Sequence, residues 1–310
     1  MKYSFVIPVY NEAGNITKLH NEIFTIGNQL LDSFEIIYIN DGSKDNSLEV
    51  LKTLSNATVI ELNRNYGQAT ALDAGFKQAT GEFVISLDGD GQNDPSDVPK
   101  MLQYLIDNNL DVVAGWRKKR SDKGRIKVLT RIGRLMRRLM IKDTVHDTGC
   151  TLRVYRQVAV KSLDLQGEMH RYILALLRWK GFRIGEVIVN DRARVYGKSA
   201  YGMSKAIRGF IDLVFIWFIH KYSQRPLHIF GYASLIVFFV ASFFLAYAVY
   251  QKIFLNIGIN RSGHFLLGSF GLLGSLIMFT FGVVIDLLIK IHLNNSPVEK
   301  RYYIREVIKK

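Results

Sequence analysis

The sequence is poor in cysteine and lacks the glycine-rich motifs of the common nucleotide-binding folds. Cys150 is the only cysteine in 310 residues, so no disulfide can form within the chain, and the thiol fits a reducing compartment. No GxGxxG and no GxxxxGK[ST] motif occurs, which excludes the usual dinucleotide and P-loop fingerprints. There is also no zinc-ligand spacing. Any bound nucleotide is therefore not held mainly by a glycine-rich loop.

Acidic residues are fewer than basic ones, but the imbalance is uneven along the chain. The whole chain has 41 Lys and Arg against 27 Asp and Glu, a net charge of +14. Residues 1–114 hold 7 basic and 16 acidic residues, whereas residues 115–138 hold 11 basic residues and one acidic residue, Asp122. An acidic first third argues against a nucleic-acid-binding protein. It predicts a cation site beside a surface that faces phosphates or a membrane.

Formal charge is absent from two long apolar runs near the C-terminus. The first has 26 residues between Arg225 and Lys252, and the second runs from Ser262 to Ile285 and continues through Asp286. Each exceeds the roughly 20 residues that cross a bilayer core, and each is far longer than a helix buried in a soluble protein. We expect membrane spans over 226–251 and 265–289, joined by a short external loop over 252–264.

Basic residues flank this pair of spans. The connecting loop carries only Lys252 and Arg261, whereas Lys221 and Arg225 precede the first span and six basic residues lie within 290–310. The positive-inside rule therefore predicts that both termini and the N-terminal domain are cytoplasmic, in an inner-membrane protein. The apolar run after Lys2 is too short for a signal peptide.

Two further segments are expected at the membrane interface. Residues 126–141 alternate Ile, Leu and Met with Arg at helical spacing, including Arg131, which is typical of a basic amphipathic helix on anionic headgroups. The alternative is a solvated helix packed on the N-terminal domain. The segment 203–225 contains the aromatic-rich stretch 210–220, which is too short to span.

The N-terminal domain, expected over residues 1–202, begins with alternating strands and helices. Strands are predicted at 3–9, 34–40, 58–62, 82–88 and 111–116, and helices at 12–31, 47–54, 68–79 and 95–108, the last capped by Ser96. This order predicts an α/β fold with a mostly parallel sheet covered on both faces. Ligands bind such sheets beyond the C-terminal ends of the strands.

Polar side chains gather at those strand ends. Asp88 and Asp90 follow a predicted buried strand, and Gly89 and Gly91 allow the backbone to turn between them. Carboxylate oxygens suit Mg²⁺ or Mn²⁺, and Gln92 adds a neutral oxygen. The sequence therefore predicts a metal site made of Asp88, Asp90 and Gln92.

Several stretches together resemble the family 2 glycosyltransferases. The donor-site stretches are VIPVYNE (Val6–Glu12), NDGSKD (Asn40–Asp45), RNYG (Arg64–Gly67) and DGDGQNDP (Asp88–Pro95). Further stretches resemble the polyprenyl-phosphate branch of that family: GWR (Gly115–Arg117), HDTGCTLRVYR (His146–Arg156), HRYI (His170–Ile173) and RVYGKSAYG (Arg194–Gly202). The resemblance implies a GT-A fold. It also implies transfer of one hexose from a nucleotide sugar to a polyprenyl phosphate.

The same resemblance implies roles for individual residues. The implied donor-binding residues are Pro8, Tyr10, Asn11, Glu12, Asp41, Arg64, Asp88, Gly89 and Asp90. The implied acceptor or phosphate ligands are Arg117, Arg131, Arg194 and Lys198, and the implied catalytic residues are Asp90, Asp147 and Arg117. UDP-glucose is the first expectation for the donor and GDP-mannose the second. The lipid is expected to be undecaprenyl or dolichyl phosphate.

A polyprenyl-phosphate acceptor needs to be aligned with the donor, but it has little need of a general base. A phosphate monoester is already an anion near neutral pH, and a one-step displacement would invert the anomeric centre. Asp147 is either a base or a residue that pins its loop, and both interpretations stay open.

The pattern of the C-terminal tail predicts that the chain forms a homo-oligomer. Residues 298–310 alternate apolar and charged side chains as a strand does, and a lone strand needs a partner. We expect pairing with a neighbouring protomer in a homo-oligomer, a tetramer by similarity to bacterial relatives.

Two alternatives remain for the function. A processive polysaccharide synthase usually carries QxxRW, but here Ala175 precedes Arg178 and Trp179, and two spans form no channel. A non-catalytic membrane adaptor of the same fold is the other alternative, although the chain keeps both aspartates of the DxD motif.

Overall fold

The computed structural model describes residues 2–30, 32–118, 145–192, 217–218, 226–258 and 263–295. The chain divides into two compact units, Met1–Val214 and Phe215–Lys310. The expected amphipathic helix at 126–141, most of the segment 203–225 and the tail strand at 298–310 lie outside the described residues.

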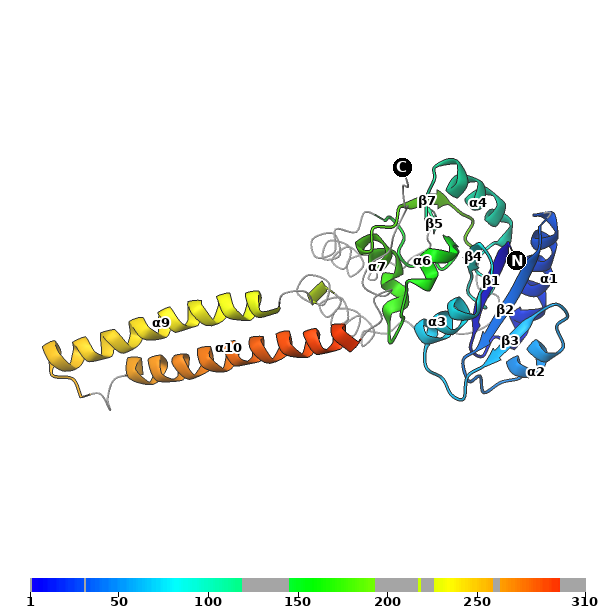
Figure 1. Cartoon of the computed structure of the whole chain (residues 1–310). Helices are drawn as coiled ribbons and strands as arrows, with labels where there is room; N and C mark the ends of the chain where they lie inside the picture. Colours follow the sequence, from blue (N-terminus) through cyan, green and yellow to red (C-terminus); the bar gives the residue numbers. More distant parts are fainter. Residues whose placement is uncertain are drawn as a thin grey trace. The chain divides into compact units, whose positions relative to one another are not determined.

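The first unit is built on one seven-stranded sheet (Figure 1). Its strands are β1 (Tyr3–Val9), β2 (Phe34–Asn40), β3 (Thr58–Glu61), β4 (Phe83–Ser86), β5 (Val112–Trp116), β6 (Arg153–Arg156) and β7 (Ile184–Ile188). The order is β3-β2-β1-β4-β6-β5-β7. The pairs β1–β2, β1–β4, β2–β3 and β5–β7 are parallel, whereas β6 is antiparallel to both of its neighbours. The prediction of a mostly parallel sheet is confirmed.

Helices cover both faces of this sheet, as the alternating pattern predicted. The helical elements are α1 (Ala13–Gln29), α2 (Ser47–Lys52), α3 (Gln68–Gln78), η1 (Pro95–Asp97), α4 (Val98–Asp107), α6 (Gln157–Lys161), η2 (Met169–Tyr172) and α7 (Ile173–Trp179). Side chains of α1, α2 and α4 share one apolar core with the odd-numbered residues of β1, such as Phe5 and Ile7. Side chains of α3, α6 and α7 share the other core with Val6 of the same strand. Burial on both faces explains why these strands are almost continuously apolar.

Two local details set the positions of elements that carry the site. A Cβ atom at Gly75 would collide with the side chains of Val6 and Ile39, so the missing side chain lets α3 lie close against the sheet.

The expectation that Ser96 caps the helix predicted at 95–108 is wrong. Instead, the Asp94 carboxylate accepts a hydrogen bond from the Ser96 amide at 3.0 Å, because Asp94 holds the N-cap position of η1.

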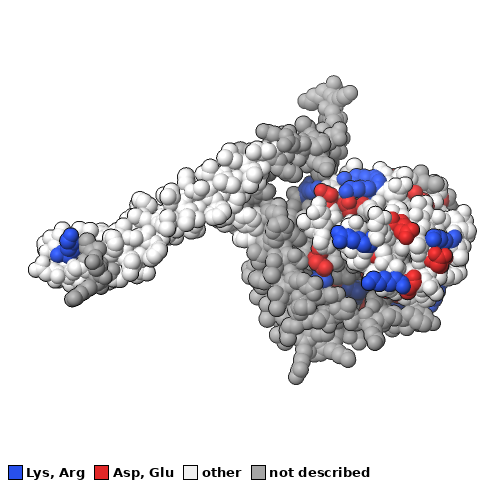
Figure 2. Space-filling view, turned by 90° about the horizontal axis from the view of Figure 1, so that it is seen from below, with Lys and Arg blue, Asp and Glu red and all other residues white. Residues whose placement is uncertain are grey.

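The second unit contains two long helices, α9 (Pro226–Leu255) and α10 (Gly263–Asn295). Within them, Leu227–Leu255 and Gly263–Ile289 have mean hydropathies of 2.3 and 2.4, and both are long and apolar enough to cross a membrane. Where the helices meet, small residues are buried, among them Ala241, Ala248 and Ser275. Figure 2 shows the contrast in surface charge: the hairpin is free of Lys, Arg, Asp and Glu along most of the face in view, whereas the first unit carries both signs.

Candidate active site

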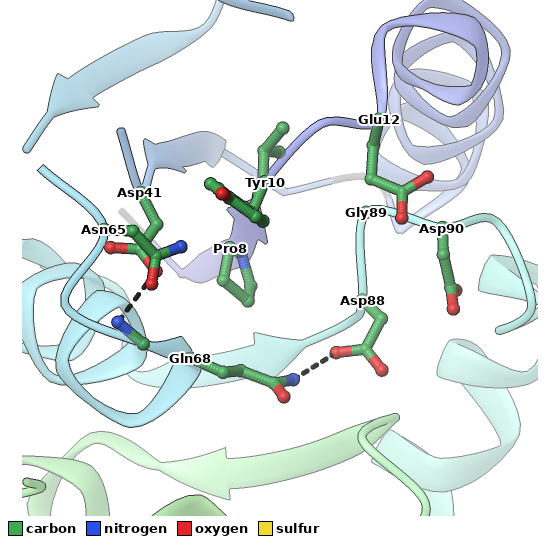
Figure 3. Close-up of a pocket in the computed structure, with 11 residues that line it drawn as sticks. Pro8, Tyr10, Glu12, Asp41, Asn65, Gln68, Asp88, Gly89 and Asp90 are labelled. Atoms are coloured by element: carbon green, nitrogen blue, oxygen red, sulfur yellow. Dashed lines mark hydrogen bonds between the residues drawn. The ribbon is translucent and has the colours of Figure 1, made fainter. Parts of the chain in front are cut away.

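A cavity of about 250 Å³ lies at the C-terminal ends of β1, β2 and β4, next to the start of α3 (Figure 3). Its lining residues are Pro8, Val9, Tyr10, Glu12, Asp41, Asn65, Gly67, Gln68, Asp88, Gly89 and Asp90. They come from four separate stretches of the chain. The sheet brings these stretches together because parallel neighbouring strands end at the same edge.

One end of the cavity is organised by Asp41. Its buried carboxylate accepts the backbone N–H of Tyr66 at 2.7 Å and that of Gly67 at 2.9 Å, so it fixes the loop before α3. Burial raises the pKa of Asp41, and these two hydrogen bonds oppose that rise. Gly67 has φ of 92°, a conformation that favours glycine. Tyr10 is 41% exposed, so part of its ring is open to a ligand in the cavity.

Reciprocal hydrogen bonds hold the loops that surround this end. The backbone N–H of Asn11 donates to Ser43 Oγ at 3.1 Å, and the side-chain Oδ1 of Asn11 accepts from the backbone N–H of Lys44 at 2.8 Å. The Glu12 amide donates to Ser47 Oγ at 2.9 Å. Asn11 thus joins the loop after β1 to the loop after β2, and its side chain does not line the cavity.

Asp88 and Asp90 form the other end. Asp88 Oδ1 accepts a hydrogen bond from Gln68 Nε2 at 2.6 Å, and Asp90 Oδ1 accepts from the Gln92 amide at 3.0 Å. The loss of water around Asp88 raises its pKa to about 6, with the negative charge of Asp90 as a second cause. A cation held at this end would offset the repulsion between the two negative charges.

The donor set at this end fits a hard divalent cation. Both side chains offer carboxylate oxygens, the ligands that Mg²⁺ and Mn²⁺ prefer. Within the residues that the structure describes, no group of three or more His, Cys, Asp or Glu side chains gathers as a metal site. Two carboxylates suit an ion that keeps several waters or binds phosphate oxygens as well. The Gln92 side chain is not among those that line the cavity.

Beyond the cavity, Arg117 and Asp147 form a buried ion pair at the end of β5. Arg117 Nε lies 2.8 Å from Asp147 Oδ2, and Nη2 lies 3.2 Å from Oδ1, so the pair is bidentate. The two side chains are 12% and 8% exposed. Arg117 Nη1 also lies 3.7 Å from Asp191 Oδ1, and Asp147 Oδ1 accepts the Gly149 amide at 3.1 Å. These carboxylates raise the pKa of Arg117 against the effect of its burial.

The residues next to this pair are also fixed. The rings of Trp116 and His146 stack with centroids 4.3 Å apart, and His146 Nδ1 lies 2.8 Å from Glu186 Oε2. Cys150 is buried, and burial raises the pKa of its thiol to about 11. A protonated, buried thiol is a poor nucleophile, so the cysteine serves packing here.

The sequence model of the family described as "Glycosyl transferase family 2" matches residues 4–164. The chain belongs to this family. Among curated proteins, it is 32% identical to a dodecaprenyl-phosphate galacturonate synthase of Rhizobium johnstonii, over 99% of this chain and 93% of that protein. It is 34% identical to an undecaprenyl-phosphate 4-deoxy-4-formamido-L-arabinose transferase of Yersinia pestis, over 69% of this chain and 66% of that protein.

Solved structures show that this glycosyltransferase has the GT-A fold. A glucosyl-3-phosphoglycerate synthase from Mycobacterium tuberculosis, crystallised with Mn²⁺, UDP and glucosyl-3-phosphoglycerate, matches with a TM-score of 0.57 and 18% identity. The match covers 70% of this chain and 79% of that chain. At this identity the likeness concerns the fold alone.

The structure brings together seven of the residues that the sequence singled out in the glycosyltransferase. Pro8, Tyr10, Glu12, Asp41, Asp88, Gly89 and Asp90 line the cavity. Asn11, Arg64, Gln92, Arg117 and Asp147 lie outside its lining, and Arg131, Arg194 and Lys198 lie outside the described residues. The Arg64 guanidinium stacks over the Tyr66 ring at 4.7 Å from its centroid.

Sequence reasoning missed four residues of the cavity. Val9, Asn65, Gly67 and Gln68 line it but were not among the candidates. Three of them adjoin or belong to the RNYG stretch, which already marked this loop. Gln68 could not be found from the sequence, because only the folded sheet places the first residue of α3 beside Asp88.

Proposed function

We propose that this glycosyltransferase moves one sugar from a nucleoside diphosphate sugar to the phosphate of a membrane polyprenol. The observation that carries the proposal is the cavity, which has Tyr10 and Asp41 at one end and the carboxylates Asp88 and Asp90 at the other. Both curated relatives are named for sugar transfer to a polyprenyl phosphate, and one of them matches almost the whole chain. The two apolar helices suit an enzyme whose acceptor lies in a membrane.

In this proposal the two ends of the cavity bind different parts of the donor. Pro8 and the exposed part of Tyr10 offer an apolar surface for the base, and Asp41 offers a carboxylate to a base N–H. Uridine is the first base we propose and guanosine the second, since both present such an N–H. Asn11 and Arg64 support this end through the loops that they hold.

The diphosphate of the donor would lie at the other end. Asp88 and Asp90 would hold Mg²⁺ or Mn²⁺, with Gln92 nearby, and Gly89 lets the chain between them lie close to Pro8 and Val9 at the end of β1. The ion, when bound, neutralises charge on the diphosphate as it leaves. Asp90 is the residue of this pair that we propose as essential for transfer.

The acceptor side requires a cation that is held in place. A phosphate oxygen of the lipid would attack the anomeric carbon as the bond from that carbon to the nucleoside diphosphate breaks, with inversion. We propose that Arg117 aligns the acceptor phosphate and that Asp147 positions Arg117 through its bidentate contact. Because the phosphate is already anionic, no general base is required at this step. Arg131, Arg194 and Lys198 are proposed as further phosphate ligands.

The reaction is proposed in more detail than the identity of the sugar that is transferred. Glucose is the expectation from the sequence, whereas the relatives are named for galacturonate and for 4-deoxy-4-formamido-L-arabinose. Relatives of similar identity thus act on different sugars. We also propose that both termini are cytoplasmic, that the enzyme lies in the inner membrane, and that it assembles as a homotetramer.

The test uses the full-length protein in detergent with Mn²⁺ and either undecaprenyl or dolichyl phosphate. Radiolabelled UDP-glucose, UDP-galacturonic acid, a formamido-substituted UDP-pentose and GDP-mannose are supplied one at a time. We expect label from one donor to enter the organic phase and to disappear with Asp90→Ala. Label in a water-soluble polymer would instead support a processive synthase. No label from any donor, with folded protein, would contradict the proposal.

A further inference from the structure

We infer that Gln68 is a positioning residue that orients Asp88 for the divalent cation and links the cation to the nucleoside end of the cavity. The inference rests on the proposed function because it concerns the same donor site. It goes further in assigning a task to a residue outside both the DxD motif and the RNYG stretch.

The contact itself is short and lies inside the cavity. Gln68 Nε2 donates to Asp88 Oδ1 at 2.6 Å, and both residues line the cavity (Figure 3). An amide donor engages one carboxylate oxygen and fixes the plane of the carboxylate. The Thr151 side chain also hydrogen-bonds to Asp88, so the carboxylate is oriented by both donors, and Gln68 is the one of the two that lines the cavity. Such donors behind a metal-binding carboxylate set its orientation and affect metal affinity.

Gln68 is held by a rigid element. It is the first residue of α3, whose side chains Leu72 and Phe76 are buried in the core and whose Gly75 lies against β1 and β2. Asp88 is fixed from its own side, because its amide donates to Asn93 Oδ1 at 3.0 Å. Both partners are thus preset, which is the requirement for a positioning contact rather than an incidental one.

The same turn of chain also contacts the nucleoside end. Gly67 donates its N–H to Asp41 at 2.9 Å, and the next residue, Gln68, donates to Asp88. Two consecutive residues therefore connect the carboxylates at the two ends of the cavity. A nucleotide bound at the Asp41 end would hold this turn in its preset position and so favour the orientation of Asp88 that binds the cation. By linkage, the cation favours nucleotide binding to the same degree.

The test measures metal binding directly in the full-length protein in detergent. Free Mn²⁺ is followed by electron paramagnetic resonance during titration, with and without UDP as the probe nucleotide. Gln68→Met keeps the size of the side chain and removes the donor. Gln78→Met, at the exposed end of the same helix, is the matched control. Gln68→Ala is a second variant, and circular dichroism and thermal melting report folding.

We expect Gln68→Met and Gln68→Ala to raise the Kd for Mn²⁺ by about tenfold. They should also reduce the factor by which UDP tightens Mn²⁺ binding, whereas Gln78→Met should change neither. In transfer assays the concentration of Mn²⁺ at half-maximal rate should rise more than the rate at saturating Mn²⁺ falls. A helix-stabilising role alone would lower the melting temperature and leave the Kd unchanged.

Different failures have different meanings. If folded Gln68 variants bind Mn²⁺ within twofold of wild type, with and without UDP, the inference is overturned. If wild type binds Mn²⁺ and UDP in a Gln68-dependent way but transfers no sugar to a polyprenyl phosphate, the inference stands and the proposed acceptor is wrong. If wild type binds no Mn²⁺ even with UDP, both the metal site and the inference are wrong.

Discussion

The two units of this glycosyltransferase place the same kinds of side chain in opposite surroundings. In the first unit Phe5 is fully buried within the sheet, whereas in the hairpin Phe243 is 67% exposed. Nearly all of the buried apolar residues among those described belong to the first unit, with Ala241 and Ala248 as the exceptions in the hairpin. One unit hides its apolar surface from water within itself, and the other presents it outward.

This difference indicates that the two units suit different surroundings, water for the first and lipid for the second. A sheet with two apolar cores is stable in water because folding removes that apolar area from water. A pair of helices with apolar side chains on the outside suits a lipid environment, where those side chains need no cover from water. Within a bilayer the contact between the helices depends on close packing of small residues rather than on the hydrophobic effect. The catalytic unit and the hairpin should therefore respond independently to substitution.

The strongest test applies one substitution to both units. Phe5→Ala removes a ring from the core, so we expect it to lower the free energy of unfolding of the first unit by about 3–5 kcal/mol. Phe243→Ala should leave that unit unchanged. Because Cys150 is the single cysteine and is buried in the first unit, its alkylation in denaturant measures that unit alone. Equal effects of the two substitutions would contradict the separation of the units.

The next prediction concerns catalysis. Asp90→Ala should reduce sugar transfer by roughly 10²–10³-fold, because we propose that Asp90 holds the divalent cation that stabilises the charge of the leaving diphosphate. Asp107→Ala, at the exposed end of α4, is the matched control and should keep full activity. The measurement is the initial rate at saturating donor, with Cys150 protection showing that the fold is kept. Retention of more than a tenth of the wild-type rate would rule out the proposed role.

A charge in the hairpin tests the other side of the comparison. Phe239 is 67% exposed near the middle of α9, so Phe239→Arg should disfavour insertion by about 2.5–3.5 kcal/mol. Phe239→Leu should insert normally. The fraction of protein that resists carbonate extraction from membranes measures the effect. If both variants remain equally in the membrane, the assignment of α9 as a lipid-facing span is wrong.

The smallest expected effect separates the two interpretations of Asp147. Asp147→Asn keeps the shape of the side chain and removes its charge, while Arg117 retains Asp191 at 3.7 Å. We expect the KM for the lipid acceptor to rise by about tenfold, as a misaligned cation binds phosphate less well. The dependence of kcat on pH should stay as in wild type. Loss of the acidic limb of that profile would identify Asp147 as a base and refute its positioning role.

Much of the first unit was predictable because local patterns there agree with the fold. Strands at 3–9 and 34–40 have the predicted bounds, and Asp88 and Asp90 lie where the motif placed them. Strand β6 was not predicted, because it is a four-residue segment whose antiparallel place between β4 and β5 depends on distant partners. The prediction that Ser96 caps the helix was wrong because Asp94, two residues earlier, has the extended backbone of an N-cap and its side chain accepts the Ser96 amide.

The sequence by itself determined the family, the alternating architecture, the two apolar runs and the motif residues at the strand ends, because each follows from local order along the chain. Only the tertiary structure decided that Gln68 reaches Asp88, that Asp41 holds the loop before α3, and that Asp147 pairs with Arg117 across 30 positions of sequence. These contacts join segments that no local pattern connects. Their geometry exists only once the sheet has brought its strand ends to a common edge.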